Sequence, residues 1–236
     1  MGDSSFTTFL LIFGQLIAVT TQLAVPPEHC PEMCICDHVE KFVMCQDKKL
    51  AHVPMSLPNG TKLLGLSKNI FTHLTPNMFD KTGVSASLES VVLYDNRIQD
   101  IEPMSFSGLD NVHSIWLFGN YLKTLAANAF VGLPSLTLLD LSRNIISDIS
   151  QGAFNGLNSI QAMHLWGNNL TTIDENAFQG LENLNNLTLG KEISTVQLSC
   201  NFDSVYEFLK INLHSNSVRN VGVNIIIIIV EPDITS

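Results

Sequence analysis

The sequence predicts an α/β solenoid, a fold in which short coils of similar structure stack along one axis. Three observations predict it: a column of asparagines, a column of phenylalanines with the same spacing, and a tight cysteine cluster ahead of the first coil. Repetition at a fixed period is the signature of such architectures, in which each unit contacts its neighbours. The chain of 236 residues, 45% of them hydrophobic, is long enough to bury a continuous core.

Residues 1–24 are predicted to be a secretory signal peptide. The apolar run FTTFLLIFGQLIAV, residues 6–19, is too short for a comfortable membrane span, and a polar stretch and PPEHC follow it. No Lys or Arg precedes the run. The prediction therefore depends on the cysteines as well.

Residues 25–60 are predicted to be a cysteine-bearing cap. Four of the five cysteines lie in CPEMCICDHVEKFVMC, residues 30–45, with the spacing C-x3-C-x-C-x8-C. In a secreted chain an even cluster this tight is typical of disulfides. A zinc site is the alternative, although zinc clusters usually place CxxC pairs across a long loop. The fifth cysteine, Cys200, is expected to be buried and free, or to pair with another chain.

Residues 61–190 are predicted to form about six repeats. They share a phrase that reads in turn LLGLSKN, VVLYDN, IWLFGN, LDLSRN and MHLWGN, and its asparagines are Asn69, Asn96, Asn120, Asn144 and Asn168. The last four are spaced by 24, and the first gap is 27, which KTGVSAS (81–87) explains as a loop insertion. The phenylalanine column, with the same spacing, consists of Phe79, Phe106, Phe130, Phe154 and Phe178. Two independent columns with the same period are strong evidence for the repeat.

One repeat cannot bury its own leucines, so the coils must stack. The LxL part of each phrase is predicted to be a strand, in which successive side chains point to opposite faces. In the third repeat, Ile115 and Leu117 then point inward, and Trp116 and Phe118 point outward. Stacked strands give a parallel sheet on one side of the solenoid. A buried asparagine amide where the chain leaves the strand can bond backbone groups of the turn. The phenylalanines are expected to form a second buried column on the return leg.

The cap and the repeats together, residues 30–190, resemble the extracellular leucine-rich repeat family, whose pattern is LxxLxLxxNxL. Similar caps and repeats occur in Slit-like proteins, Nogo-receptor-like proteins, variable lymphocyte receptors and small leucine-rich proteoglycans. The resemblance implies a horseshoe with a parallel concave sheet and an irregular or short-helical convex side. In the family's cap the first cysteine pairs with the third and the second with the fourth. This implies Cys30–Cys36 and Cys34–Cys45 here.

The repeat pattern stops in the sixth repeat, where Glu192 stands in place of the asparagine. Residues 191–213 are predicted to be a degenerate C-terminal cap, because Phe202 stands where the family's cap has a second cysteine. Residues 214–236 are predicted to be a poorly structured tail. Its isoleucine run is too short to span a bilayer, and such a run is a strand or an aggregation hazard.

The sequence holds none of the motifs that would indicate an enzyme. GxSxG, HExxH, the P-loop and the dinucleotide-binding glycine pattern are all absent. We therefore expect no catalytic residues, no metal and no cofactor. With 12 basic against 22 acidic residues and a net charge of −10, nucleic acid is not an expected partner. No transmembrane segment is expected in this chain.

The candidate ligand-binding residues are the large or polar outward-facing residues of the concave sheet. They are Tyr94, Trp116, Phe118, Asp140, His164 and Trp166. Contiguous exposed apolar area usually marks an interaction surface, and Trp and Tyr are frequent hot spots. A homodimer interface is one alternative. Simple strand packing is another, since aromatics favour strands.

Three sequons, at Asn59, Asn169 and Asn186, are candidate glycosylation sites. Asn169 is expected to leave the concave face, whereas Asn186 is expected to lie on it in the sixth repeat. Sugar on Asn186 would confine a protein ligand to the second to fifth repeats.

The sequence therefore predicts an extracellular module, secreted or held at the cell surface by an anchor outside this chain. It would recognise a protein or glycan-bearing ligand through its concave sheet. The alternatives are a structural matrix component of the small leucine-rich proteoglycan type and a self-associating adhesion protein.

Overall fold

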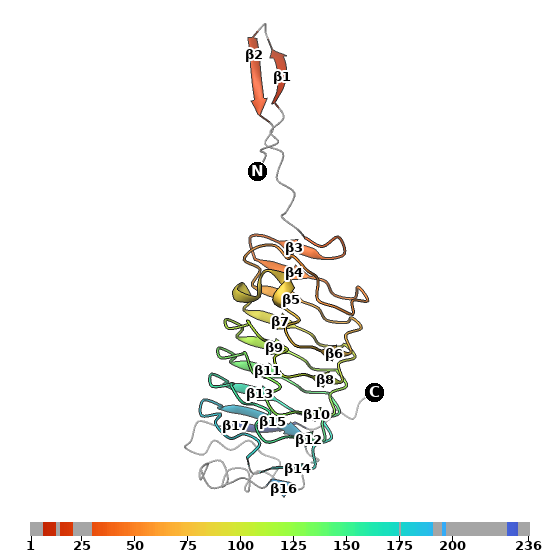
Figure 1. The fold of residues 1–236 in the computed structure, drawn as a ribbon, viewed down its shortest axis with the longest axis vertical. Helices are drawn as coiled ribbons and strands as arrows, with labels where there is room; N and C mark the ends of the chain where they lie inside the picture. Colours follow the sequence, from red (N-terminus) through yellow and green to blue (C-terminus); the bar gives the residue numbers. More distant parts are fainter. Residues whose placement is uncertain are drawn as a thin grey trace.

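The computed structural model describes residues 30–174 and 176–189 with their side chains, and residue 190 by its backbone. Elsewhere it describes the backbone of four short segments, residues 7–12, 15–20, 195–196 and 226–230. Residues 30–190 build a solenoid of stacked coils, in which a long sheet lies along one side and short strands along another (Figure 1). The predicted fold class, a solenoid with a parallel sheet, is confirmed.

The long sheet takes one strand from each coil. The repeat strands are β5 (Leu63–Gly65), β7 (Ser90–Val92), β9 (Ser114–Trp116), β11 (Leu138–Asp140), β13 (Ala162–His164) and β15 (Asn186–Gly190), all parallel to their neighbours. The register never slips: Asp140 pairs with Trp116 on one side and with His164 on the other. Equivalent residues of successive repeats therefore lie in straight rows across the sheet.

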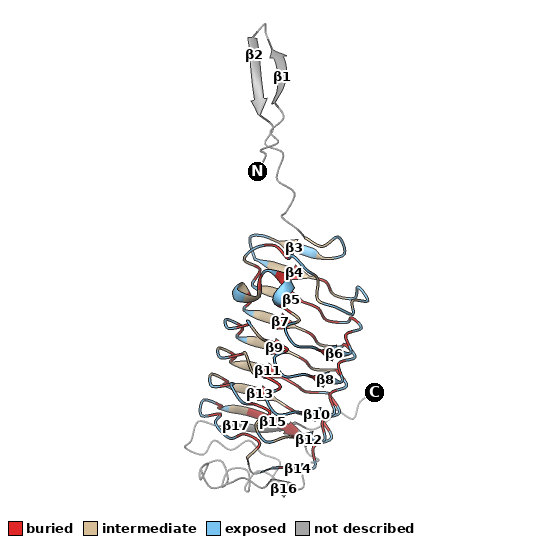
Figure 2. Cartoon of the chain, in the orientation of Figure 1, coloured by how far each residue is buried: buried red, intermediate tan, exposed pale blue. Residues whose placement is uncertain are grey.

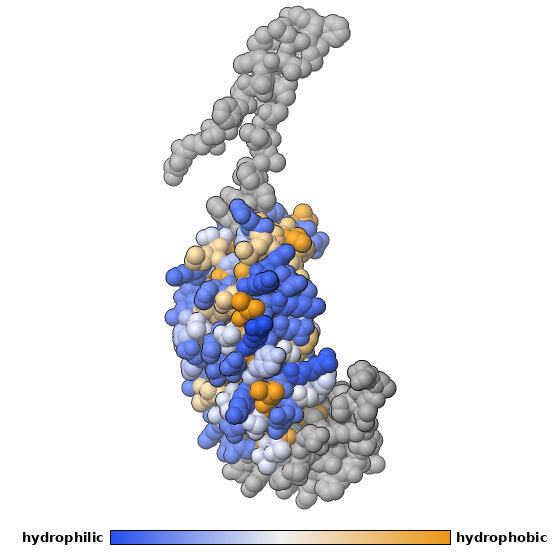
Figure 3. Space-filling model, turned by 90° about the vertical axis from the view of Figure 1, so that its right-hand side faces the viewer, coloured by the Kyte–Doolittle hydropathy of each residue, from blue (hydrophilic) through white to orange (hydrophobic). Residues whose placement is uncertain are grey.

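The return legs carry two-residue strands on the opposite side of the coils. They are β6 (His73–Leu74), β8 (Asp100–Ile101), β10 (Thr124–Leu125), β12 (Asp148–Ile149), β14 (Thr172–Ile173) and β16 (Thr195–Val196). They pair in parallel as β6 with β8, β10 with β12 and β14 with β16. The face that carries these strands is mainly hydrophilic, with small separate apolar patches (Figure 3).

The insertion predicted at 81–87 is not a free loop. It folds into two short 3-10 turns, η1 (Asp80–Thr82) and η2 (Ser85–Ser87). The carbonyl of Lys81 accepts a hydrogen bond from the Ser56 N–H at 3.0 Å, and that of Thr82 accepts one from the Leu57 N–H at 2.8 Å. Through Lys81 and Thr82 the insertion thus joins the first repeat to the cap.

One apolar core runs through all the coils (Figure 2). The phenylalanine column forms the predicted second row: ring centroids of neighbouring coils lie 6.3, 6.0, 5.9 and 5.6 Å apart, each pair stacked. Phe106 and Phe130 are fully buried. Because each ring packs against the ring of the next coil, the spacing of the return legs is fixed along the stack.

The asparagine column joins each coil to the one before it. The Asn120 Nδ2 donates to the carbonyls of Leu93 and Leu117 at 3.0 and 2.9 Å, and its Oδ1 accepts from the Ile98 N–H at 3.1 Å. Leu93 and Ile98 belong to the preceding coil. Asn96, Asn144 and Asn168 repeat the arrangement. The amides satisfy buried backbone groups that would otherwise lack partners.

The cap closes the N-terminal end of the core. Its strands are β3 (Ile35–Asp37) and β4 (Phe42–Met44), antiparallel to each other, and β4 is parallel to β5. Disulfides join Cys30 to Cys36 and Cys34 to Cys45, which is the pairing that the resemblance implies. Val43 and Cys45 are fully buried in the core. The cap thus covers leucines that the first repeat would otherwise expose.

Outside residues 30–190 the described backbone consists of strands. Residues 7–12 and 15–20 form an antiparallel pair, β1 (Thr7–Ile12) and β2 (Gln15–Thr20). Within the tail predicted to be poorly structured, five residues form β17 (Ile226–Val230), which pairs in parallel with β15 and extends the repeat sheet. Glu192, Cys200 and Phe202, on which the C-terminal cap prediction depends, lie outside the described residues.

Candidate ligand-binding face

The solvent side of the long sheet is called the sheet face below; it corresponds to the concave face expected from the sequence. Three columns of outward positions run along it. One column, at the start of the strands, contains Leu63, Ser90, Ser114, Leu138, Ala162 and Asn186. The central column contains Gly65, Val92, Trp116, Asp140, His164 and Thr188, and the second column contains Ser67, Tyr94, Phe118, Ser142 and Trp166. In β9 the burial alternates as the sequence predicts, with Ile115 fully buried and Trp116 half-buried.

The second column holds two aromatic groups. The rings of Tyr94 and Phe118 stack, with centroids 4.6 Å apart and planes 8° from parallel. Further along, the Arg143 guanidinium carbon lies 5.7 Å from the centroid of Trp166, within the range of a cation–π contact. All three rings are half-buried, so each still exposes part of its surface.

The small residues of the second column are buried although they occupy outward positions. Ser67 is 1% exposed and Ser142 is 2% exposed. In the central column the Met44 sulfur lies against Gly65, in the space that a Cβ would take. The large side chains therefore pack along the sheet as well as facing solvent, which gives them fixed positions.

The central column has its own polar contacts. Asp140 is 9% exposed, and its Oδ1 accepts hydrogen bonds from the Ser142 N–H at 3.0 Å and the Ser142 hydroxyl at 2.6 Å. The His164 Nδ1 lies 2.9 Å from the Thr188 hydroxyl. These bonds hold the carboxylate in the strand next to Trp116 and the imidazole one strand further along, so both polar groups have fixed positions on the face.

A left-handed residue precedes each asparagine of the column and borders the sheet face. At Gly167, with φ +69°, an added Cβ would lie 3.4 Å from the Arg143 backbone nitrogen and 3.5 Å from its Cγ. These are ordinary van der Waals distances, so glycine is favoured at this position by its backbone conformation and not by lack of space. At Gly119, with φ +68°, an added Cβ would collide with the Asp95 carboxylate.

All six candidate ligand-binding residues lie on the sheet face. The structure groups them as the Tyr94–Phe118 stack, the Trp116–Asp140–His164 row and the separate Trp166. Arg143 was not predicted from the sequence as a partner of Trp166. The available signal was an arginine directly before the column asparagine of the coil that precedes the one with Trp166.

The three sequons differ in accessibility. Asn59 and Asn169 are exposed, and Asn186 is half-buried on the sheet face. The Asn186 Oδ1 is buried and has no hydrogen-bond partner, and Thr188 of the same sequon bonds His164. Asn169 follows the asparagine column and so lies beyond the edge of the sheet face, as expected. Glycosylation at any of the three stays a prediction.

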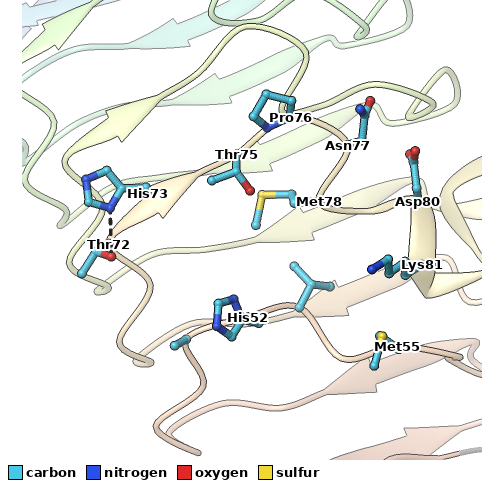
Figure 4. A pocket seen from close by; sticks show the side chains of 12 residues that line it. His52, Met55, Thr72, His73, Thr75, Pro76, Asn77, Met78, Asp80 and Lys81 are labelled. Atoms are coloured by element: carbon cyan, nitrogen blue, oxygen red, sulfur yellow. Dashed lines mark hydrogen bonds between the residues drawn. The ribbon is translucent and has the colours of Figure 1, made fainter.

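A hollow of about 720 Å³ lies between the cap and the first return leg (Figure 4). Side chains on its two sides include His52 and Met55 from the cap and His73 and Asp80 from the first repeat. The His73 Nε2 lies 3.5 Å from an Asp100 carboxylate oxygen. Most of the lining is exposed, and among the residues that the structure describes no group of three His, Cys, Asp or Glu side chains could hold a metal ion. The hollow suggests no specific chemistry.

No helix in the described part of the chain is long and apolar enough to cross a membrane.

Stacked coils, an asparagine ladder and a disulfide cap define a leucine-rich repeat protein. The family described as "BspA type Leucine rich repeat region", in six copies, matches residues 72–222, and the chain belongs to the leucine-rich repeat family. The match covers most of the solenoid.

Curated relatives place the chain near Nogo-receptor-like proteins. Reticulon-4 receptor-like 2 of Rattus norvegicus is 33% identical over 126 residues, covering 52% of this chain and 29% of the relative. The Homo sapiens protein of the same name is 32% identical over 129 residues, covering 54% and 29%. In Xenopus tropicalis, the leucine-rich repeat and immunoglobulin-like domain-containing nogo receptor-interacting protein 1 is 34% identical over 88 residues, covering 37% and 14%. The chain thus spans less than a third of the length of these relatives.

Among solved structures, the crystal structure of a TLR13–ssRNA13 complex is similar in fold. The TM-score is 0.60 at 26% sequence identity, over 70% of this chain and 25% of the other. This likeness supports the same repeat architecture.

Proposed function

We propose that the chain is an extracellular binding module that recognises a protein ligand through its sheet face. The observation that carries this proposal is the set of half-exposed aromatics at the centre of the sheet, above all Trp116 and Trp166. Tyr, Trp and Arg are the residues most often found as hot spots of protein interfaces. This face offers Tyr94 and both tryptophans of the chain, and Arg143 at its border already lies against the ring of Trp166.

Rigidity supports the same proposal. The asparagine column and the phenylalanine stack fix the coils, while the Tyr94–Phe118 stack and the Arg143–Trp166 contact hold aromatic side chains of the face. A ligand that binds such a surface immobilises few side chains, so little of the contact energy is lost to ordering. The surface is therefore suited to recognition by a preformed site.

The extracellular location depends on two features of the N-terminal part. The apolar segment at 6–19 has the length and position of a secretory signal, and two disulfides close the cap. The names of the relatives include "receptor-like" and "receptor-interacting". A receptor-type role for this chain is in keeping with those names.

A binding screen tests the proposal. The secreted chain is presented to a panel of extracellular proteins, and each hit is measured again with Trp116→Ala and Trp166→Ala. Each substitution is expected to weaken binding by roughly 1–3 kcal/mol and to leave the melting temperature nearly unchanged, because both side chains lie outside the core. Hits that bind both variants normally would show that the sheet face is not the site.

The matched control is Tyr121→Ala. Tyr121 is an aromatic residue that is 53% exposed, but it follows the asparagine column and lies off the sheet face. Its loss should leave binding unchanged. Light scattering across a concentration series tests the homodimer alternative: a dimer that Trp116→Ala dissociates would assign the face to self-association.

A further inference from the structure

A single charge stands among the outward residues of the sheet face. From position 63 to position 188 these residues are glycine, alanine, serine, threonine, asparagine, histidine, aliphatic or aromatic, and the only Asp, Glu, Lys or Arg among them is Asp140. It lies in the fourth of six repeat strands, near the middle of the candidate site. A ligand that covers Trp116 and Trp166 must therefore also cover this carboxylate.

One oxygen of the Asp140 carboxylate has no hydrogen-bond partner among the residues that the structure describes. Its Oδ1 accepts both hydrogen bonds from Ser142, and its Oδ2 accepts none from any residue that the structure describes. Asp140 is only 9% exposed, so a ligand that covers it would remove most of the water that still contacts it. Desolvating an ionised carboxylate is costly unless a hydrogen-bonding cation replaces the water.

The neighbours of Asp140 suit a guanidinium or an ammonium group. Trp116 and His164 pair with it in the adjacent strands, and each strand lies about 4.8 Å away. A cation bound to the free Oδ2 would thus lie beside an indole, where cation–π attraction adds to the ion pair. The chain already shows this kind of contact two coils from Trp116, where Arg143 lies over Trp166.

From these observations we infer that the ligand of the sheet face inserts an arginine or lysine side chain, flanked by apolar residues, between Trp116 and His164 onto Asp140. The inference rests on the proposed function, and it names the chemistry of the partner. The net charge of −10 acts in the same direction, since it attracts a basic protein surface at long range.

Peptide selection tests this inference. A random peptide library is selected on the immobilised secreted chain, and peptides that also bind Trp116→Ala are discarded. The surviving peptides are expected to contain an Arg or Lys between apolar residues. Each is then synthesised in two forms, with arginine (in place of lysine where a lysine was selected) and with its neutral isostere citrulline. Binding is followed through the fluorescence of the two tryptophans, both of which lie on this face.

Asp140→Asn is expected to weaken the arginine peptides by about tenfold or more. The amide keeps an oxygen that can accept from Ser142, and the melting temperature checks that the variant folds. The citrulline peptides should lose a similar factor on the natural chain and bind Asp140→Asn and the natural chain equally. Asp148→Asn is the control, because Asp148 is exposed on β12, away from the sheet face.

The outcomes separate the two proposals. Peptides that require Trp116 but lack basic residues, or that bind Asp140→Asn and the citrulline form at full strength, overturn the cation inference and leave the sheet face as a binding site. If no peptide survives the Trp116→Ala step, the screen gives the sheet face no support as a binding surface, and the cation inference falls with it.

Discussion

In every coil the asparagine column and the outward columns lie within a few residues of each other, yet they follow opposite rules. From Asn69 to Asn168 the amide is the same in five coils, and each one makes equivalent bonds. The central outward column instead reads glycine, valine, tryptophan, aspartate, histidine and threonine. Positions that hold the same residue in every coil bond neighbouring coils to each other and so hold the solenoid together. Positions whose residues differ from coil to coil make no such shared bond, and they can serve recognition.

The largest effect is expected from the shared column. Asn120→Ala would leave the Ile98 N–H and the carbonyls of Leu93 and Leu117 without this partner in a buried site. At about 1–3 kcal/mol for each unsatisfied group, the loss should be at least about 3 kcal/mol of unfolding free energy. Urea denaturation measures it. The control is Asn158→Ala at an exposed position, which should change stability by less than about 0.5 kcal/mol.

If Asn120→Ala and Asn158→Ala lower the unfolding free energy by the same amount, the asparagine column does not hold the coils together. The contrast between the columns would then be wrong.

A second prediction concerns the end of the shared column, where the cap takes the place of a coil. The Asn69 Nδ2 donates to the carbonyl of Cys45 in the cap. Replacing both Cys34 and Cys45 by alanine should cost roughly 2–5 kcal/mol. Hydrogen exchange should show faster opening of the first repeats than of the fifth. Uniform loss of protection along the chain would mean that the cap stabilises all coils as one unit.

The smallest effect is expected at the border between the two kinds of column. Gly167→Ala places a Cβ at a left-handed position and close to the Arg143 backbone, at a cost of about 1 kcal/mol. Because this Cβ would meet Arg143 at ordinary van der Waals distances, Arg143 should stay over Trp166 and the emission of Trp166 should not change. The spectra of Gly167→Ala in a Trp116→Phe background isolate Trp166. A changed spectrum would mean that the strained backbone at residue 167 displaces Arg143 from the ring.

The repeat was predictable from the sequence because it depends on period alone. Two columns at one spacing determine which residues face inward, and the structure places Ile115 and Trp116 accordingly. The burial of Ser67 and Ser142 was not predictable, because it depends on how side chains of adjacent coils lie across the sheet. Arg143 was missed for a similar reason. Its partner Trp166 lies in the next coil, and Arg143 itself has a left-handed backbone conformation that the sequence does not show.

The insertion at 81–87 shows another limit. Its composition indicates a loop, and the backbone bonds of Lys81 and Thr82 to Ser56 and Leu57 follow only from the tertiary fold. The isoleucine run was expected to be a strand or an aggregation hazard, and only the tertiary fold shows that residues 226–230 pair with β15.

The asparagine ladder also gives the chain a direction of growth. The Asn96 Oδ1 accepts from the Phe71 N–H and the Asn120 Oδ1 from the Ile98 N–H, so each coil is completed by the coil that follows it. Removing or adding one whole 24-residue unit within the array, such as 121–144, leaves every such bond replaceable by an equivalent one. Deleting only part of a unit instead leaves a backbone N–H without the asparagine oxygen that it donates to. Such a protein is expected to change its length in evolution by entire coils.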